Sequence, residues 1–268
     1  MPDQRGVVGR AAAARLAARF GVRVILHDTV DSTMDAAGRD AGSRPVVHVA
    51  ATQTAGRGRR GRLWASPPGN LYATICWPDA DAVLMPGLLA AIQLAWAEAI
   101  GVAGGPDARC KWPNDGLVAG EKWAGVLAVR AKGPEGSEVR VGLGANLETP
   151  PGELGPKALP ATTLAAKWPA WPGSDVVGVL LLEVALGILS EGPQENSARL
   201  ARWPERDALT LGEAVRVTSE AGDEVGAYAG LAPDGRLRLD VGGDIRLLAS
   251  GDVERLRKAA QQHADRLA

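Results

Sequence analysis

Three short segments of the chain carry residues that could act on a phosphate. Residues 56–62 read Gly-Arg-Gly-Arg-Arg-Gly-Arg and place four guanidinium groups on a backbone that glycine keeps flexible. Residues 111–115 read Lys-Trp-Pro-Asn-Asp, and Lys122 precedes an apolar run. Arginine and lysine bind anionic oxygens, and a carboxylate such as that of Asp115 can hold the Mg²⁺ that accompanies a nucleotide. Together the segments predict phosphoryl or nucleotidyl chemistry.

The glycines of residues 56–62, hereafter the arginine loop, also match the G-x-G-x-x-G pattern of dinucleotide-binding folds. That pattern needs a helix directly after it, whereas residues 63–70 contain two prolines and a glycine. The Gly-Lys-Ser/Thr ending of a Walker A motif is missing. Arginine–glycine tracts can also bind nucleic acid, but this tract is short and the formal net charge is −1. A solvated loop without function is the remaining alternative.

The residues of the other two motifs have ordinary structural explanations as well. Lys111 and Lys122 lie at the ends of expected strands, where a lysine is commonly solvated. Asp115 lies in an Asn-Asp-Gly turn, where an aspartate more often caps the backbone than binds a metal. The two lysines nevertheless flank a carboxylate within a dozen residues, in a chain where lysine is scarce. This grouping favours a common site.

The overall composition is that of a globular protein without membrane spans. A chain of 268 residues can form one sizeable core and a small appended domain. The hydrophobic content of 46% is ordinary, and no apolar run is long enough to cross a bilayer. The first residues lack the layout of a secretory signal. Two cysteines cannot form a disulfide framework, and three histidines disfavour a zinc site. We therefore expect a cytoplasmic enzyme or binding protein.

Hydrophobic periodicity predicts the elements that position these motifs. Strands are expected where β-branched and apolar residues dominate, at residues 22–27, 46–53, 71–77, 109–111, 123–130 and 138–146. Helices are expected over residues 10–20, from a cap at Asp31 or Ser32, from Pro86 to about residue 100, and over 176–189. The proline-rich residues 149–173 are predicted to form a long loop over the site.

After Trp203-Pro204 the sequence changes to short alternating runs separated by Gly-Asp and Pro-Asp-Gly turns. This spacing predicts a small β-barrel. The expected organisation is an N-terminal helical extension, a main domain, the barrel and a helical tail, at residues 1–21, 22–207, 208–256 and 257–268.

Taken together, these motifs resemble those of the biotin protein ligases, which attach biotin to the carrier lysine of biotin-dependent carboxylases. The resemblance covers residues 25–256. It rests on the arginine loop with Trp64, on Lys-Trp-Pro-Asn-Asp at 111–115, on Lys122 before Ala-Gly-Val-Leu, and on Gly-Leu-Gly-Ala-Asn at 142–146. It implies an α+β fold, in which a mixed β-sheet with helices packed on it is followed by a small SH3-like β-barrel.

The resemblance also implies a two-step reaction that uses ATP and Mg²⁺. Biotin would first be activated to biotinyl-5′-AMP, and would then be transferred to a lysine of a biotin carboxyl carrier protein or domain. A membrane is not an expected partner. DNA is not expected either, because the N-terminal region does not have the sequence features of a DNA-binding domain. A homodimer through the sheet edge stays open.

Residue roles follow from the same resemblance. The catalytic residues would be Lys122, Arg57, Lys111 and Asp115. Biotin would contact Ser32, Thr33, Gln53, Arg57 and Gly125. The nucleotide or adenylate would contact Arg59, Arg60, Arg62, Trp64, Asn114, Lys122, Gly142, Gly144 and Asn146. Asp115 would contact Mg²⁺ brought by the nucleotide, and no tightly bound metal held by the protein alone is expected. The arginine loop is expected to order when biotinyl-adenylate binds.

Two positions depart from the family pattern. Met34 stands where many members have asparagine, and Val129 stands where glutamate is common. The nearest alternative is a lipoate or octanoate ligase or transferase, which shares the fold and the acyl-adenylate chemistry but generally lacks the arginine loop in this form. An alternative of another class is a nucleic-acid-binding protein without enzymatic activity, which would use residues 56–62.

Overall fold

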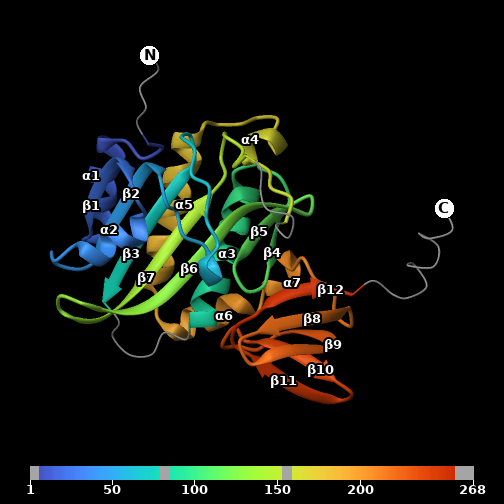
Figure 1. Ribbon diagram of the computed structural model, residues 1–268. Helices are drawn as coiled ribbons and strands as arrows, with labels where there is room; N and C mark the ends of the chain where they lie inside the picture. The colour runs from blue at the N-terminus through green and yellow to red at the C-terminus, as the bar shows by residue number, and fades with distance from the viewer. Residues whose placement is uncertain (1–5, 79–84, 153–158, 257–268) are drawn as a thin grey trace.

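The computed structural model describes residues 6–78, 85–152 and 159–256. They form a seven-stranded mixed sheet with packed helices, and a smaller five-stranded antiparallel sheet to one side of it (Figure 1). The strand order of the larger sheet is β1-β2-β3-β7-β6-β5-β4, with β1 and β2 parallel and the other neighbours antiparallel. Its strands are β1 (Arg23–Val30), β2 (Val46–Gln53), β3 (Leu71–Pro78), β4 (Ala108–Lys111), β5 (Asp115–Val118), β6 (Glu121–Gly133) and β7 (Gly136–Ala145). The predicted α+β fold is confirmed.

The expected helices form, and shorter ones are added. The helices are α1 (Arg10–Phe20), α2 (Thr33–Arg39), α3 (Met85–Val102), α4 (Leu164–Lys167), α5 (Ser174–Ser190), α6 (Pro193–Leu200) and α7 (Trp203–Arg206). Ser32 is the N-cap of α2 and accepts a hydrogen bond from the backbone N–H of Met34 at 3.2 Å. Among the described residues, no helix is both long and apolar enough to span a membrane.

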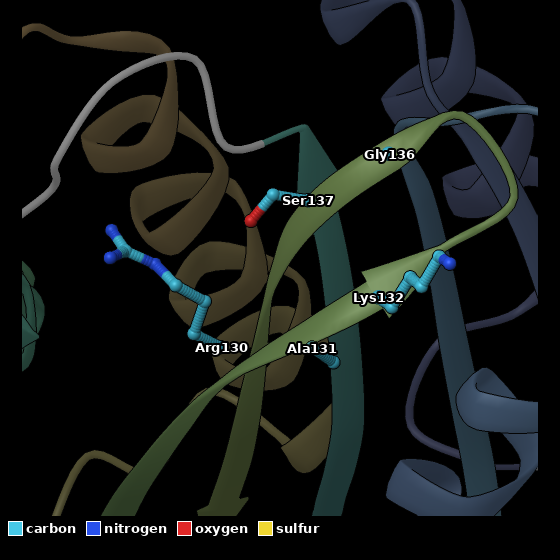
Figure 2. A pocket seen from close by; sticks show the side chains of 5 residues that line it. All are labelled: Arg130, Ala131, Lys132, Gly136 and Ser137. Atoms are coloured by element: carbon cyan, nitrogen blue, oxygen red, sulfur yellow. The ribbon is translucent and has the colours of Figure 1, made fainter.

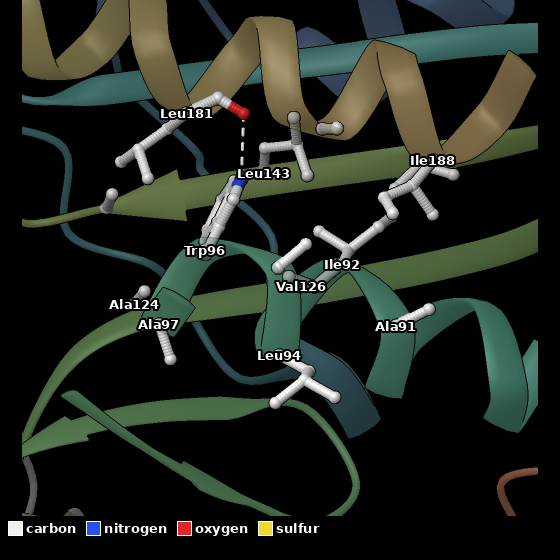
Figure 3. Packing of buried hydrophobic residues seen from close by; sticks show 14 of the residues in the cluster. Ala91, Ile92, Leu94, Trp96, Ala97, Ala124, Val126, Leu143, Leu181 and Ile188 are labelled. Atoms are coloured by element: carbon white, nitrogen blue, oxygen red, sulfur yellow. Dashed lines mark hydrogen bonds between the residues drawn. The ribbon is translucent and has the colours of Figure 1, made fainter. Parts of the chain in front are cut away.

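The core lies between the larger sheet and the apolar helices α3 and α5 (Figure 3). The Trp96 indole N–H donates to the backbone oxygen of Leu181 at 2.7 Å, which joins the two helices. Trp123 of β6 packs against Trp96 and is 1% exposed. Because side chains alternate along a strand, burial of Trp123 on the helix side directs the neighbouring Lys122 to the opposite face of the sheet.

The segment before the predicted catalytic lysine folds more tightly than expected. Residues 109–116, predicted as one strand ending in a turn, form two short antiparallel strands, with Lys111 of β4 opposite Asp115 of β5. The turn between them is closed by Gln93 of α3, whose side-chain N–H donates to the backbone oxygen of Pro113 at 2.7 Å. This buried contact to the core helix explains the abrupt chain reversal.

The C-terminal sheet has one strand more than the sequence predicts. Its strands are β8 (Ala214–Ser219), β9 (Gly222–Leu231), β10 (Leu237–Val241), β11 (Asp244–Leu248) and β12 (Asp252–Arg255), in the order β11-β10-β9-β8-β12. The four alternating runs correspond to β8–β11. Strand β12 was not predicted because its sequence is charged, with Val253 as its one apolar and buried residue. From sequence alone, such a segment cannot be distinguished from a polar tail.

The smaller sheet packs beside the β4–β5 turn. The indole N–H of Trp112, which is 1% exposed, donates to the backbone oxygen of Gly235 at 3.0 Å. The backbone N–H of Ala208 donates to the oxygen of Cys110 at 2.8 Å. These contacts bring the small domain next to the predicted site. The domain boundaries stay predictions, and the predicted tail at 257–268, residues 1–5 and part of the 149–173 loop lie outside the described residues.

Candidate active site

The lysine predicted to be catalytic forms an ion pair with the predicted carboxylate. Lys122 Nζ lies 2.5 Å from Asp115 Oδ1, and the two side chains are 24% and 18% exposed. The carboxylate oxygen accepts no hydrogen bond of regular geometry, so this ion pair is its main partner. The half-buried pair can therefore exchange partners when another charged group enters.

Lys111 adds a second positive charge. It is paired in register with Asp115 across β4 and β5, while Lys122 follows on the adjacent β6. Burial lowers the pKa of Lys111, and Asp115 partly opposes this shift while Lys122 reinforces it. Two lysines around one carboxylate leave a net positive charge, which favours an incoming anion.

Trp64 covers two glycines in front of Lys122. Gly125 and Gly144 face each other in the β6–β7 register. A Cβ atom on Gly144 would lie 2.6 Å from Cε2 of Trp64, and one on Gly125 would lie 3.0 Å from Cζ3. Lys122 Nζ is 5.1 Å from the centroid of the Trp64 ring. The glycines are therefore required for the close approach of the indole to the sheet, and the indole is the flat wall of the site.

Gly142 lies in β7, and Asn146 directly follows the end of this strand. Asn146 is 2% exposed, and its side-chain oxygen has no hydrogen-bond partner among the described residues. Burying such an oxygen without a partner costs free energy, so it is a candidate ligand contact. Gly142 is covered by Met34, whose Cε would lie 3.0 Å from an added Cβ. Met34 thus fills space on the site face of β7.

Two of the predicted biotin contacts, Thr33 and Gln53, are joined by hydrogen bonds. The Thr74 hydroxyl donates to the Thr33 hydroxyl at 2.9 Å, and both the backbone N–H and the hydroxyl of Thr33 donate to Gln53 Oε1, at 2.8 and 3.2 Å. Gln53 Nε2 donates to the Ser66 hydroxyl at 2.8 Å, which donates to the Trp64 oxygen at 3.0 Å. Sequence reasoning missed Thr74 and Ser66; both are buried polar residues, which only the fold reveals. The network fixes Trp64 relative to α2 and β2.

Arg57 is not brought together with Lys122. Its Nε donates to Asp35 Oδ2 of α2 at 2.8 Å, and the arginine side chain is 59% exposed. The base of the arginine loop is held separately: the Trp64 N–H donates to the oxygen of Gly56 at 2.8 Å. A Cβ on Gly56 would lie 2.4 Å from the Trp64 oxygen, so this position requires glycine.

The other three arginines of the loop converge on Asp252 of β12, which the sequence analysis did not identify. Arg59 Nη1, Arg60 Nη1 and Arg62 Nη2 lie 3.2, 3.1 and 3.2 Å from its carboxylate oxygens. Arg59 also donates to Asn114 Oδ1 at 3.0 Å. Through Asn114, Arg59 thus contacts the Lys-Trp-Pro-Asn-Asp motif of residues 111–115.

The residues present fit a magnesium ion only as a companion of phosphate. Asp115 offers one carboxylate, and Mg²⁺ is commonly bound by one or two carboxylates together with substrate phosphates. Within residues 6–78, 85–152 and 159–256, no group of three or more His, Cys, Asp and Glu residues is arranged to hold a metal.

A surface depression at the outer end of the β6–β7 hairpin is separate from this site (Figure 2). It is lined by Arg130, Ala131, Lys132, Gly136 and Ser137. Arg130 lies five residues beyond Gly125, which is roughly 16 Å along β6. The depression is therefore not part of the Lys122 site.

Comparison with known families assigns the class of protein. Residues 27–146 match the model of the biotin/lipoate A/B protein ligase family, and residues 210–256 match that of the biotin protein ligase C-terminal domain. The first match contains all of the predicted site residues, and the second contains Asp252. The fold and site are thus of the biotin/lipoate ligase class.

Individual relatives narrow this class. The chain is 34% identical over 219 residues to the biotin--[acetyl-CoA-carboxylase] ligase of Mycobacterium tuberculosis, covering 79% of each chain. It is 28% identical to the bifunctional ligase/repressor BirA of Bacillus subtilis, covering 88% of this chain and 74% of that one. The biotin protein ligase of Aquifex aeolicus in complex with biotin and ATP has a TM-score of 0.74 at 26% identity, covering 88% and 99% of the chains. The chain belongs to the biotin protein ligase family.

Proposed function

We propose that this chain is an ATP-dependent biotin protein ligase, which activates biotin as biotinyl-5′-AMP and transfers it to a lysine of a biotin carboxyl carrier protein or domain. The observation that carries the proposal is the Lys122–Asp115 pair beside Trp64, in a chain with both the catalytic and the C-terminal family matches. Relatives named for acetyl-CoA carboxylase support a carrier of that enzyme class.

In the first step, a carboxylate oxygen of biotin attacks the α-phosphorus of ATP, and the bond to the pyrophosphate oxygen breaks. Both reactants are anions. Lys122 on the site face of β6 stabilises the charge that develops on the α-phosphate, and Lys111 supplies a second positive charge nearby. Mg²⁺ on the departing phosphates would neutralise further charge, with Asp115 as its protein ligand.

In the second step, the amine nitrogen of the acceptor lysine attacks the biotinyl carbonyl carbon. The carbon–oxygen bond to AMP breaks, an amide forms, AMP leaves as its phosphate anion, and the proton lost by the amine passes to solvent. Asp115 lies beside Lys122 and can hold the incoming amine by charge. Before that step the mixed anhydride must be kept from water, a role that suits the arginine loop.

Trp64 and Gly144 form the nucleotide wall in this proposal, with Gly142 and Asn146 beyond them on the same side, and Gly125 under the same indole contacts biotin. Thr33 and Gln53, fixed by their hydrogen bonds, line the biotin end, and Ser32 caps the helix that carries Thr33. Arg57 reaches biotin's carboxylate only by leaving Asp35. Arg59, Arg60 and Arg62 hold the adenylate from the loop.

Substitution of Gly144 tests the wall. Gly144→Val introduces a branched side chain at a position where even a single added Cβ would lie 2.6 Å from Trp64, and so displaces the indole. Stacking of a base on an aromatic ring contributes about 1–3 kcal/mol, so we expect the KM for ATP to rise about tenfold. Gly187→Ala in α5, where an added Cβ meets nothing within 4 Å, should leave the KM unchanged. An unchanged KM in Gly144→Val would refute the wall.

Lipoate is the alternative substrate, because the matched catalytic model covers biotin and lipoate ligases alike. The match of residues 210–256 to the biotin ligase C-terminal domain favours biotin. ATP–pyrophosphate exchange decides between them: the proposal predicts exchange with biotin and none with lipoate. Exchange with lipoate alone would overturn it. A homodimer, a cytoplasmic location and the absence of DNA binding stay predictions.

A further inference from the structure

The arginine loop is attached to the C-terminal sheet through one residue. Asp252 is the first residue of β12, and its ion pairs among the described residues all go to Arg59, Arg60 and Arg62. These arginines lie about 190 residues earlier in the chain. The carboxylate therefore does not serve its own sheet but holds a segment of the other domain.

Backbone oxygens of the same sheet complete the attachment. Arg59 Nη2 donates to the oxygen of Gly251 at 3.1 Å, and Arg60 Nη2 donates to that of Thr218 at 2.7 Å. Each guanidinium thus uses one nitrogen for the carboxylate and another for a carbonyl, which fixes its orientation as well as its position. The loop tip is held by directed contacts and not by charge alone.

Arg59 links this attachment to the active site. Its Nη1 contacts both Asp252 Oδ1 and Asn114 Oδ1, and its side chain is 13% exposed. Burial lowers the pKa of Arg59, and the Asp252 charge partly opposes this shift. A buried guanidinium beside the site is stable there because a carboxylate accompanies it. Without Asp252, the carboxylate of Asp115, which is already paired with Lys122, would be the negative charge left to act on the Arg59 guanidinium.

The charge balance leaves the loop ready for an anion. Three guanidinium groups share a single carboxylate, so two positive charges remain in excess at the loop tip. An adenylate bound at Lys122 can therefore interact with arginines that are already placed.

We propose that Asp252 is a positioning residue: it anchors the tip of the arginine loop on the C-terminal domain, so that the loop is held across the active site. The anchor itself is independent of the reaction, whereas its consequence, retention of the adenylate, rests on the proposed function. The C-terminal domain is in this way part of the cover of the site.

The anchor is tested by limited trypsin digestion of the full chain in the presence of biotin, ATP and Mg²⁺, with cleavage sites identified by mass spectrometry. Asp252→Asn should be cut within residues 56–62 about tenfold faster than the wild type, which equals about 1.4 kcal/mol. Asp252→Glu should restore most of the protection. Glu254→Gln removes a charge from the same strand, at a residue whose partner is Arg216, and should behave like the wild type.

A second readout follows release of preformed biotinyl-adenylate. Asp252→Asn should release it faster, while the kcat of pyrophosphate exchange changes little because Lys122 and Asp115 are untouched. Equal cleavage in Asp252→Asn and wild type would overturn the anchor, as would faster cleavage spread over the whole chain with a lowered Tm, which would show a general structural role. A wild-type chain without exchange would contradict the proposed function but leave the cleavage result valid.

Discussion

Lys122→Ala is expected to lower biotin-dependent pyrophosphate exchange by about 10²–10³-fold, the usual effect of removing one group that stabilises transition-state charge. Its amine is 2.5 Å from Asp115 and 5.1 Å from the Trp64 ring, so the substitution removes the positive charge that lies beside both groups. The fold should persist, because the lysine side chain is on the site face while Trp123 anchors β6 in the core.

Lys132→Ala is the matched control. Lys132 lies on the same strand but in the exposed hairpin of Figure 2, away from the site. It should keep wild-type exchange, and circular dichroism should show the same thermal transition for both variants and the wild type. Near-normal exchange in Lys122→Ala would refute the catalytic role of this lysine.

The second large effect is expected for Arg59→Gly, which should release biotinyl-adenylate prematurely. Arg59 is the loop arginine that contacts both Asn114 and Asp252, so its loss separates the loop from the catalytic motif. Free adenylate acylates lysines without selection. Incubation with biotin, ATP and an unrelated protein should therefore label that protein, and a streptavidin blot measures the labelling.

Arg62→Gly gives the comparison needed to interpret this result. It adds the same backbone freedom to the loop and also removes a contact to Asp252, but Arg62 is 59% exposed and does not contact Asn114. Labelling should be weaker than in Arg59→Gly. Equal labelling by the two variants would assign retention to the loop as a whole, and labelling of the carrier alone by Arg59→Gly would refute its retention role.

Local sequence patterns predicted the elements on both sides of the site well. The strands before and after the arginine loop are β-branched or apolar runs that form β2 and β3 as expected. The proximity of Lys111, Asp115 and Lys122 was also predictable, because a tight turn and the following strand keep such residues together. Short-range geometry is encoded in the residues that make the turn.

Contacts between distant segments could not be predicted in this way. Asp252 lies in a charged stretch that has no apolar alternation beyond Val253, and nothing in it indicates a strand or a partner in the arginine loop. Trp64 was expected as an aromatic wall, but its close packing on Gly125 and Gly144 depends on the β6–β7 register. The pairing of Arg57 with Asp35 likewise depends on where α2 lies.

Formation of biotinyl-5′-AMP at the Lys122 site is open to direct observation. Mass spectrometry of the enzyme incubated with ATP, Mg²⁺ and an equimolar mixture of biotin and lipoate tests it most directly. We expect biotinyl-5′-AMP and no lipoyl-AMP on the wild type, and almost no biotinyl-5′-AMP on Lys122→Ala. Lipoyl-AMP as the product, or as much biotinyl-5′-AMP on Lys122→Ala as on the wild type, would contradict it.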